Sequence, residues 1–323
     1  MINSHLTLFL EINDRNYIFI IGKTDQNNIF KIEYKLEVPL KGIENNRISN
    51  FDEVLNIIKE NIFLVEQKFS YTFKELVLIL ENLNPSFVNI SGYKNLNGSQ
   101  ILRENITYIL NTLKNSVEEI ETKKMIKNIF NSKFNLDNKK IENLPIGLFG
   151  DFYSHELSFS LISLNNHKNL ISIFEKCKIR VKKLLIKSFV KGANISDNNK
   201  DLDTFFVIKI NEKDTKIFLF ENNCLKFEQD FKFGTDIIIQ DISKITTLSK
   251  EEIEIILEKI KLSEDIPKDE ILEKEFFKKN NFRKIKKKLI YEVALARIKE
   301  ILEIVLFENV NFKYYNKFSY NIF

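Results

Sequence analysis

One arrangement of secondary structure is predicted twice in this chain, and this repeat constrains the fold more than any other feature. Runs of β-branched and aromatic residues between polar turns predict three opening strands, at Leu6–Ile12, Tyr17–Gly22 and Phe30–Leu36. The same pattern returns after Ser188, with strands predicted at Thr204–Ile210, Thr215–Glu221 and Cys224–Phe231. A helix follows each set of strands. The sequence therefore predicts an α/β protein with two similar lobes.

Helices are predicted where apolar residues recur with the 3.6-residue period. The first helix follows Asn50, which with Glu53 forms a predicted N-terminal cap, and its apolar face comprises Phe51, Val54, Leu55, Ile58, Ile62 and Val65. A buried strand is predicted next, at Glu75–Leu80. Later helices are predicted at Thr235–Ser243, Lys250–Lys261 and Lys286–Glu308.

The stretch between the two copies has strands and helices of its own. Strands are predicted at Phe87–Ser91, Met125–Phe134, Glu156–Leu164 and Ile179–Ile186, and a helix at Ile101–Val117. This stretch is long enough to pack its own core, so we expect a compact inserted subdomain.

Composition excludes several classes of function. With 49 basic and 45 acidic residues, the net charge of +4 is too small for a nucleic-acid-binding footprint. The basic run Arg283–Lys288 is interpreted as a solvated helix start, with a membrane or partner contact as the alternative. Cys177 and Cys224 are predicted to be core thiols of a reduced, cytoplasmic protein. The histidines, His5, His155 and His167, lack ligand spacing, so no metal site is predicted.

Several short segments, taken in order, resemble the FtsA family of actin-like cell-division proteins over essentially the whole chain. They are Val88–Gly92, Ile141–Gly150 with Pro145, Gly147 and Gly150, Lys168–Ile186 with Cys177, Gly234–Ile242 with Asp241, and Glu292–Ile301 with Arg297. The resemblance implies an actin-like (ribonuclease H-like) α/β fold with duplicated lobes and an FtsA-type insert. It divides the chain into a first lobe (1–83), an SHS2-like insert (84–187), a return helix (188–197) and a second lobe (198–323).

The resemblance also places a nucleotide site. In the superfamily, each lobe opens with a hairpin whose glycines let backbone amides reach phosphates and whose acid handles the metal or its water. The matching candidates for ATP binding are Glu11, Asn13, Arg15, Asn211, Thr215, Gly234 and Glu292.

Both hairpins depart from that pattern. Asn13 replaces a glycine in the first, where we expect the turn to survive because asparagine tolerates positive φ. In the second, Lys209 replaces the acid and Asn211–Lys213 replaces a run of glycines. We therefore expect ATP binding to be weak or lost, and we predict no catalytic residue.

The implied role is that of a scaffold. FtsA proteins self-associate into filaments through the insert, bind the C-terminal tail of FtsZ with the second lobe and contact inner-membrane division proteins. Here the tail surface is expected around Ile245–Glu300, with the protein cytoplasmic and peripheral to the inner face of the membrane. The chain ends at Phe323, so the glycine-rich adenosine loop, the final strands and the amphipathic membrane helix are expected to be missing, and membrane contact is expected only through that missing helix. The aromatic stretch Asn311–Phe323 is interpreted as core strand content of the second lobe, with a membrane-interface contact as the alternative.

Two other functions stay open at this point. A pilus-assembly adaptor of the PilM type would share the fold and the insert but have another partner. An active ATPase or small-molecule kinase of the superfamily would need the phosphate-binding hairpins that this sequence has altered. Gene neighbourhood and measured ATP binding, respectively, separate these alternatives from the division scaffold.

Overall fold

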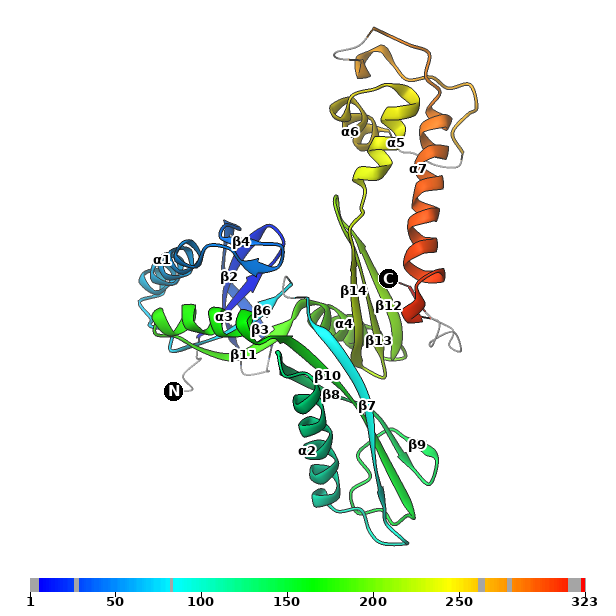
Figure 1. Cartoon of the computed structure of the whole chain (residues 1–323). Coiled ribbons are helices and arrows are strands. Elements are labelled where there is room, and N and C mark those ends of the chain that lie inside the picture. The colour runs from blue at the N-terminus through cyan, green and yellow to red at the C-terminus, as the bar shows by residue number, and fades with distance from the viewer. Residues whose placement is uncertain are drawn as a thin grey trace. The chain divides into compact units, whose positions relative to one another are not determined.

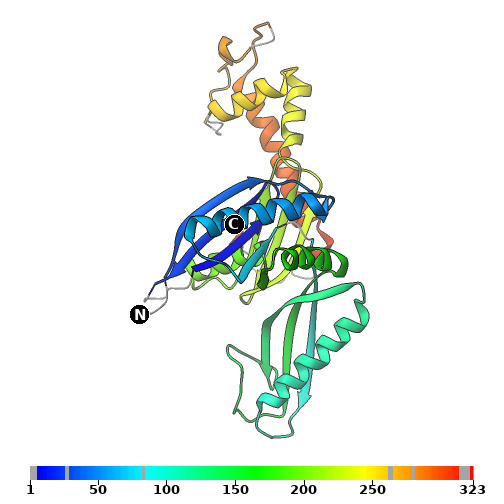
Figure 2. The ribbon, with the colours of Figure 1, turned by 90° about the vertical axis from the view of Figure 1, so that its left-hand side faces the viewer.

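The chain folds into two compact units in the computed structural model, which describes residues 6–25, 29–81, 84–260, 265–277, 281–312 and 321–322 (Figures 1 and 2). The first unit comprises Met1–Phe205 and Leu219–Glu228. The second unit comprises Phe206–Phe218 and Gln229–Phe323.

A five-stranded mixed sheet forms the core of the first unit. Its strands are β1 (Leu6–Ile12), β2 (Asn16–Thr24), β3 (Phe30–Pro39), β6 (Glu75–Leu80) and β11 (Arg180–Ile186), in the order β11-β6-β1-β2-β3. The first three strands are antiparallel, whereas β6 runs parallel to both β1 and β11. The carboxyl ends of β1, β6 and β11 therefore meet at one edge of the sheet.

Helices α1 (Phe51–Phe69) and α3 (Leu164–Lys176) pack against this sheet and against each other. Their shared core includes Leu8, Leu10, Tyr17, Phe19, Val54, Ile58, Leu76, Leu78, Leu170 and Phe174. The expected cap of α1 is present, because the Asn50 side chain accepts a hydrogen bond from the backbone N–H of Glu53 at 3.2 Å. A short hairpin, β4 (Ile43–Glu44) and β5 (Arg47–Ile48), connects β3 to α1.

The inserted segment builds a second, antiparallel sheet in the first unit. Its strands are β7 (Ser86–Asn95), β8 (Lys124–Leu136), β9 (Lys139–Ile141) and β10 (Phe152–Ser163), in the order β7-β10-β8-β9. Helix α2 (Arg103–Ile120) packs on this sheet, and the core residues are Leu96, Ile101, Ile109, Leu113, Val117, Tyr153, Leu157, Phe159 and Leu161 (Figure 2).

The segment that builds the inserted sheet ends at Ser163, before the end of the range 84–187 expected for the insert. Strand β11 pairs with β6, and Leu170 and Phe174 of α3 are buried in the core of the five-stranded sheet. The segment after residue 163 therefore belongs to the first sheet. Sequence alone did not indicate this, because the strand and helix patterns carry no information on which sheet they join.

A third sheet contains β12 (Thr204–Ile210), β13 (Thr215–Glu221), β14 (Cys224–Phe231) and β15 (Asn321–Ile322), in the order β14-β13-β12-β15. Helix α4 (Lys187–Asn198) precedes it in the chain. Gly192 of α4 faces the ring of Phe220, which occupies the space where a Cβ would lie. Of the aromatic stretch Asn311–Phe323, residues 313–320 and 323 lie outside the described residues.

A cluster of helices completes the second unit. It contains α5 (Asp236–Thr246), α6 (Lys250–Lys259), the 3₁₀ turns η1 (Lys274–Phe276) and η3 (Val310–Phe312), α7 (Lys287–Leu302) and the π-helical turn η2 (Glu303–Phe307). The expected capping box between Ser249 and Glu252 is present at the start of α6. Asp241 of α5 accepts a hydrogen bond from Arg297 of α7 at 2.5 Å. These two residues come from different segments that resemble FtsA, and their ion pair joins the two helices.

None of the helices described is both long and apolar enough to cross a bilayer. Cys224 is buried, as expected, and Cys177 is half-buried. Burial raises the pKa of the Cys224 thiol to about 12. His155 is also buried and its Nε2 contacts the side-chain oxygen of Asn131, whereas His5 lies outside the described residues.

Candidate functional site

The β1–β2 turn closes on its own backbone. The side-chain oxygen of Asn13 accepts hydrogen bonds from the N–H groups of Arg15 at 2.9 Å and Asn16 at 2.7 Å. The backbone N–H of Asn13 in turn donates to the carbonyl of Asn16 at 3.1 Å. Asn13 does not have a positive φ, so the turn survives by side-chain bonding rather than by the expected left-handed backbone. The amides of Arg15 and Asn16 are therefore bonded within the turn itself.

Glu11 lies near the end of β1 and is only 7% exposed. Its carboxylate forms an ion pair with Lys187, the first residue of α4. The pair forms because β1 and β11 end at the same edge of the sheet, and Lys187 directly follows β11. An ammonium group thus neutralises the candidate metal-handling acid. Arg15 is exposed in the neighbouring turn, and its carbonyl accepts the N–H of Leu40.

The β12–β13 turn is closed in a related way. The backbone N–H of Asn211 donates to the carbonyl of Asp214 at 2.8 Å, and the Asn211 side chain donates to the Asp214 carboxylate at 2.7 Å. The carbonyls of Asn211 and Glu212 accept hydrogen bonds from the N–H groups of Thr235 and Asp236, each at 2.9 Å. The turn is therefore bonded to the start of α5.

Gly234 lies directly beneath this turn. A Cβ at this position would overlap the backbone carbonyl oxygens of Asn211 and Glu212. Thr215 is fully buried, and its hydroxyl donates to the carbonyl of Phe233 at 2.8 Å. The structure thus brings Asn211, Thr215 and Gly234 together, and their contacts make a junction between the hairpin and the start of α5.

Lys250 adds a charged contact to this junction. Its ammonium lies 3.0 Å from the Glu212 carboxylate and 3.4 Å from the Asp236 carboxylate. The hydrogen bond from Lys250 lowers the pKa of Glu212, and the bond to Glu212 raises the pKa of Lys250 to about 12. No role for Lys250 was predicted from the sequence. Its position just after the cap of α6 gave no indication that it reaches the hairpin.

Glu292, the remaining candidate, lies apart from the junction, on the exposed face of α7. It lines a cavity of about 580 Å³ within the second unit. We call this cavity the basic groove; its lining residues are Ile245, Thr246, Lys268, Arg283, Lys284, Ile285, Lys286, Lys288, Leu289 and Glu292. None of Asn211, Thr215 and Gly234 lines it.

The basic run that precedes α7 is only partly solvated, which corrects the interpretation of Arg283–Lys288 as a water-facing helix start. Ile285 and Lys287 are both 8% exposed. Lys287 forms ion pairs with Glu270 at 2.8 Å and Glu273 at 2.7 Å, and these bonds raise its pKa. The buried residues anchor the run to the helical cluster, so the remaining cations are held along the groove.

Within the described residues, no three histidine, cysteine, aspartate or glutamate side chains are grouped to hold a metal ion. Glu11 forms its ion pair with Lys187 within the first unit. Asn211 forms its hydrogen bonds with Asp214 and Thr235 within the second unit.

The fold is actin-like, as the resemblance implied. A solved structure titled as a PilM–PilN type IV pilus biogenesis complex superimposes with a TM-score of 0.56 and 11% identity, covering 93% of this chain and 76% of the other. Among curated proteins, the chain is similar to two that are named cell division protein FtsA. It is 23% identical to FtsA of Buchnera aphidicola subspecies Schizaphis graminum (strain Sg), over 94% of this chain and 72% of that protein. It is 21% identical to FtsA of subspecies Acyrthosiphon pisum (strain APS), over 77% of this chain and 59% of that protein. No family model matches the chain.

Proposed function

We propose that the protein is a cell-division scaffold that binds the C-terminal tail of FtsZ with its second unit. It self-associates at the division site, works alongside inner-membrane division proteins, and is peripheral to the inner face of the cell membrane. Homology to FtsA supports the division role. The observation that carries the tail-binding proposal is the basic groove, which falls within the expected range Ile245–Glu300.

The groove combines cations with exposed apolar side chains. Among the lining residues, Lys284 is exposed to solvent, and the apolar Ile245 and Leu289 are 55% and 38% exposed. Five of its lining residues are cationic, against the single carboxylate of Glu292. A short peptide that carries both carboxylates and apolar side chains would satisfy both parts of this surface.

Weak or lost ATP binding is part of the proposal. Phosphate-binding hairpins work by directing free backbone amides at the ligand. Here the amides of Arg15 and Asn16 are bonded to Asn13, and those of Thr235 and Asp236 are bonded to the β12–β13 turn. Lys187 neutralises Glu11. A scaffold needs none of this phosphate chemistry, because its function depends on protein surfaces.

Exposed apolar residues of the inserted subdomain, one on β7 and the others on α2 and its N-cap and on the β9–β10 connection, support self-association. They are Tyr93, Leu102, Tyr108, Leu144, Ile146, Leu148 and Phe149. Phe149 is 69% exposed and Tyr93 is 66% exposed. Apolar side chains gathered on one small subdomain are typical of a protein–protein interface.

Fluorescence anisotropy with a labelled peptide of the FtsZ C-terminal tail, taken from the same organism, tests the tail-binding proposal. We expect saturable binding that K284E and L289S each weaken by about tenfold or more. K299E is the matched control, because Lys299 is an exposed lysine of α7 outside the groove. Failure of the wild-type chain to bind the peptide, or equal losses in K284E and K299E, would refute the proposal.

A second candidate function is supported by the superposition with the PilM–PilN complex. On this alternative, the chain is a pilus-assembly adaptor on the same fold. A peptide from a PilN-like protein of the same organism, tested in the anisotropy assay, separates the two. Binding of that peptide without binding of the FtsZ tail would favour the pilus role.

A further inference from the structure

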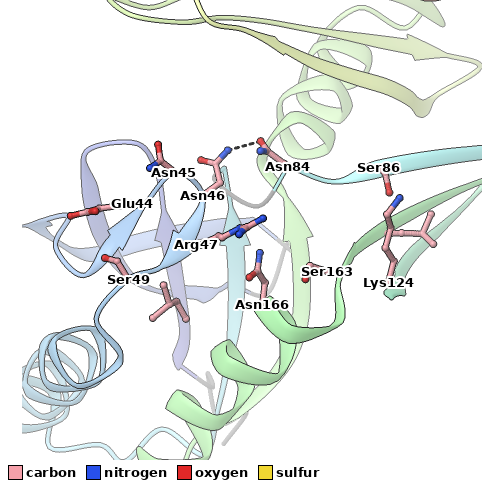
Figure 3. A pocket seen from close by; sticks show the side chains of 12 residues that line it. Glu44, Asn45, Asn46, Arg47, Ser49, Asn84, Ser86, Lys124, Ser163 and Asn166 are labelled. Atoms are coloured by element: carbon pink, nitrogen blue, oxygen red, sulfur yellow. Dashed lines mark hydrogen bonds between the residues drawn. The ribbon is translucent and has the colours of Figure 1, made fainter. Parts of the chain in front are cut away.

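The first unit contains a polar cavity that none of the seven candidate nucleotide residues lines. Its volume is about 810 Å³, and its lining residues are Glu44, Asn45, Asn46, Arg47, Ile48, Ser49, Asn84, Ser86, Lys124, Leu161, Ser163 and Asn166 (Figure 3). We call it the Arg47 cavity. A volume of this size is within the range of small-molecule sites. Nine of its twelve lining residues carry amide, hydroxyl or cationic side chains, which favours a negatively charged ligand with several acceptor oxygens.

Arg47 is presented to the cavity by the β4–β5 hairpin. Asn45 and Asn46 form the two-residue turn with φ values of 48° and 61°, a conformation that asparagine tolerates well, and Arg47 follows directly. The side chain of Asn46 donates to that of Asn84 at 2.5 Å, which joins the hairpin to the segment leading into β7. Figure 3 shows Arg47 in the middle of the lining, between Asn46 and Asn166.

The Arg47 guanidinium has five donors, and among the described residues it makes no ion pair or hydrogen bond. An arginine at an ordinary surface position can be solvated without a partner. Here it lies in a cavity beside the amide of Asn166, so a ligand with several acceptor oxygens could bind both.

The start of α3 adds donors to the same cavity. Ser163 is the N-cap residue and Asn166 lies in the first turn, and both line the cavity. The Ser163 side chain makes no capping hydrogen bond to the helix, which leaves the positive end of the helix without its usual side-chain acceptor. A helix start of this kind favours an anion.

The opposite end of the cavity supplies two further polar groups. The hydroxyl oxygen of Ser86 is buried and has no hydrogen-bond partner. In Figure 3 the side chain of Lys124 extends toward Ser86, and its ammonium also lies 3.0 Å from the Glu121 carboxylate. Glu44 lies at the far end of the lining from Lys124 (Figure 3). The buried, unpaired hydroxyl indicates a place where a ligand atom would bind.

We infer that the Arg47 cavity binds a phosphorylated small molecule, with the phosphate at Arg47, Asn166 and the start of α3. The remaining volume, toward Ser86 and Lys124, holds the hydroxyl-bearing organic part. Tetrahedral phosphate suits this set because it offers three or more acceptor oxygens to donors that converge from different directions. This site is separate from tail binding and does not depend on the proposed function.

Isothermal titration calorimetry on the full chain tests the inference with two probes, ribose 5-phosphate and inorganic phosphate. We expect one ribose 5-phosphate per chain, bound more tightly than inorganic phosphate, and no binding of ribose. R47Q should weaken binding by about tenfold or more, since a charge-assisted hydrogen bond is lost. Arg47 is exposed, so R47Q should keep the thermal stability of the wild type.

Two further variants distinguish ligand binding from damage to the fold. E44Q should strengthen binding by about twofold, because it removes a like charge from the lining. R103Q, which neutralises an exposed arginine of α2 outside the cavity, should leave binding unchanged. Absence of binding by either phosphate probe, equal affinity for the ester and inorganic phosphate, or equal effects of R47Q and R103Q would overturn the inference.

Discussion

The backbone carbonyl oxygen of Asn211 occupies the space that a Cβ at residue 234 would need, so Gly234 allows the β12–β13 turn to rest on the start of α5. Gly234 has no positive φ, and its role is therefore close packing and not backbone conformation. The same contact lets Thr235 and Asp236 donate to the turn carbonyls. Gly234, one of the candidate nucleotide residues, is therefore also a packing residue of this junction.

Substitution of this glycine should destabilise the second unit. G234A should lower the free energy of unfolding by about 2–3 kcal/mol, because the added methyl meets backbone atoms that cannot rotate away. Thermal and urea denaturation followed by circular dichroism measure the change.

Gly98 is a useful comparison, since its φ is +77° but the space around it is open. G98A should cost only about 1 kcal/mol, from backbone strain. A G234A protein as stable as the wild type would contradict this account of the junction.

The sequence predicted the main strands and helices because their apolar periods are strong. It also predicted the caps at Asn50 and Ser249, where the capping residues are close together in sequence. It did not predict the pair between Glu11 and Lys187, which are 176 residues apart. The pair depends on the strand order, because β1 and β11 run parallel to β6 on its two sides and their carboxyl ends lie at the same edge of the sheet. Arg47 was missed because the β4–β5 strands are too short to show any period.

ATP should have little effect on the stability of the chain. A ligand present at 100 times its dissociation constant stabilises a protein by about 2.7 kcal/mol, which raises the melting temperature by several degrees. With the turn amides bonded within the protein, millimolar ATP with Mg²⁺ should shift the melting temperature by less than about 1 °C. Differential scanning fluorimetry with and without ATP provides the measurement. A shift of several degrees that EDTA abolishes would show that the altered hairpins still bind nucleotide.

Lys226 should be important for the stability of the first unit. Its side chain is 1% exposed and pairs with Glu156, and Glu221 lies 3.8 Å away. K226M leaves partly buried carboxylates without a cation and should cost about 2–4 kcal/mol. The double variant K226M/E156Q should be more stable than K226M alone, because E156Q replaces the Glu156 carboxylate, which has lost its lysine partner, with a neutral amide. Urea denaturation of both proteins tests this, with K35M at the exposed Lys35–Glu37 pair as a control that should change stability by less than about 0.5 kcal/mol. Additive losses in the double variant would contradict the pairing.

Stability of the first unit should fall in mild acid. Burial lowers the pKa of His155 to about 4, against about 6.5 in the unfolded chain. Between these values the unfolded chain binds a proton that the folded chain does not, so stability rises with pH across this window and is lost as the pH falls through it. The full effect is about 2–4 kcal/mol.

Melting temperatures at pH 7, 6 and 5 measure this dependence. H155Q should flatten the curve, because the buried group no longer takes up a proton on unfolding. His167 has a pKa lowered to about 4 by burial and by Lys127, so H167Q should remove a separate part of the dependence. A curve for H155Q with the wild-type slope would show that His155 does not contribute.

Co-sedimentation with FtsZ filaments tests the central claim, that the second unit binds the FtsZ tail through the basic groove, most directly. The wild-type chain should pellet with full-length FtsZ and stay in the supernatant with FtsZ that lacks its C-terminal tail. K284E should lose co-sedimentation, whereas K299E should retain it. Equal pelleting with the full-length and tail-less FtsZ, or no pelleting with either, would contradict the claim.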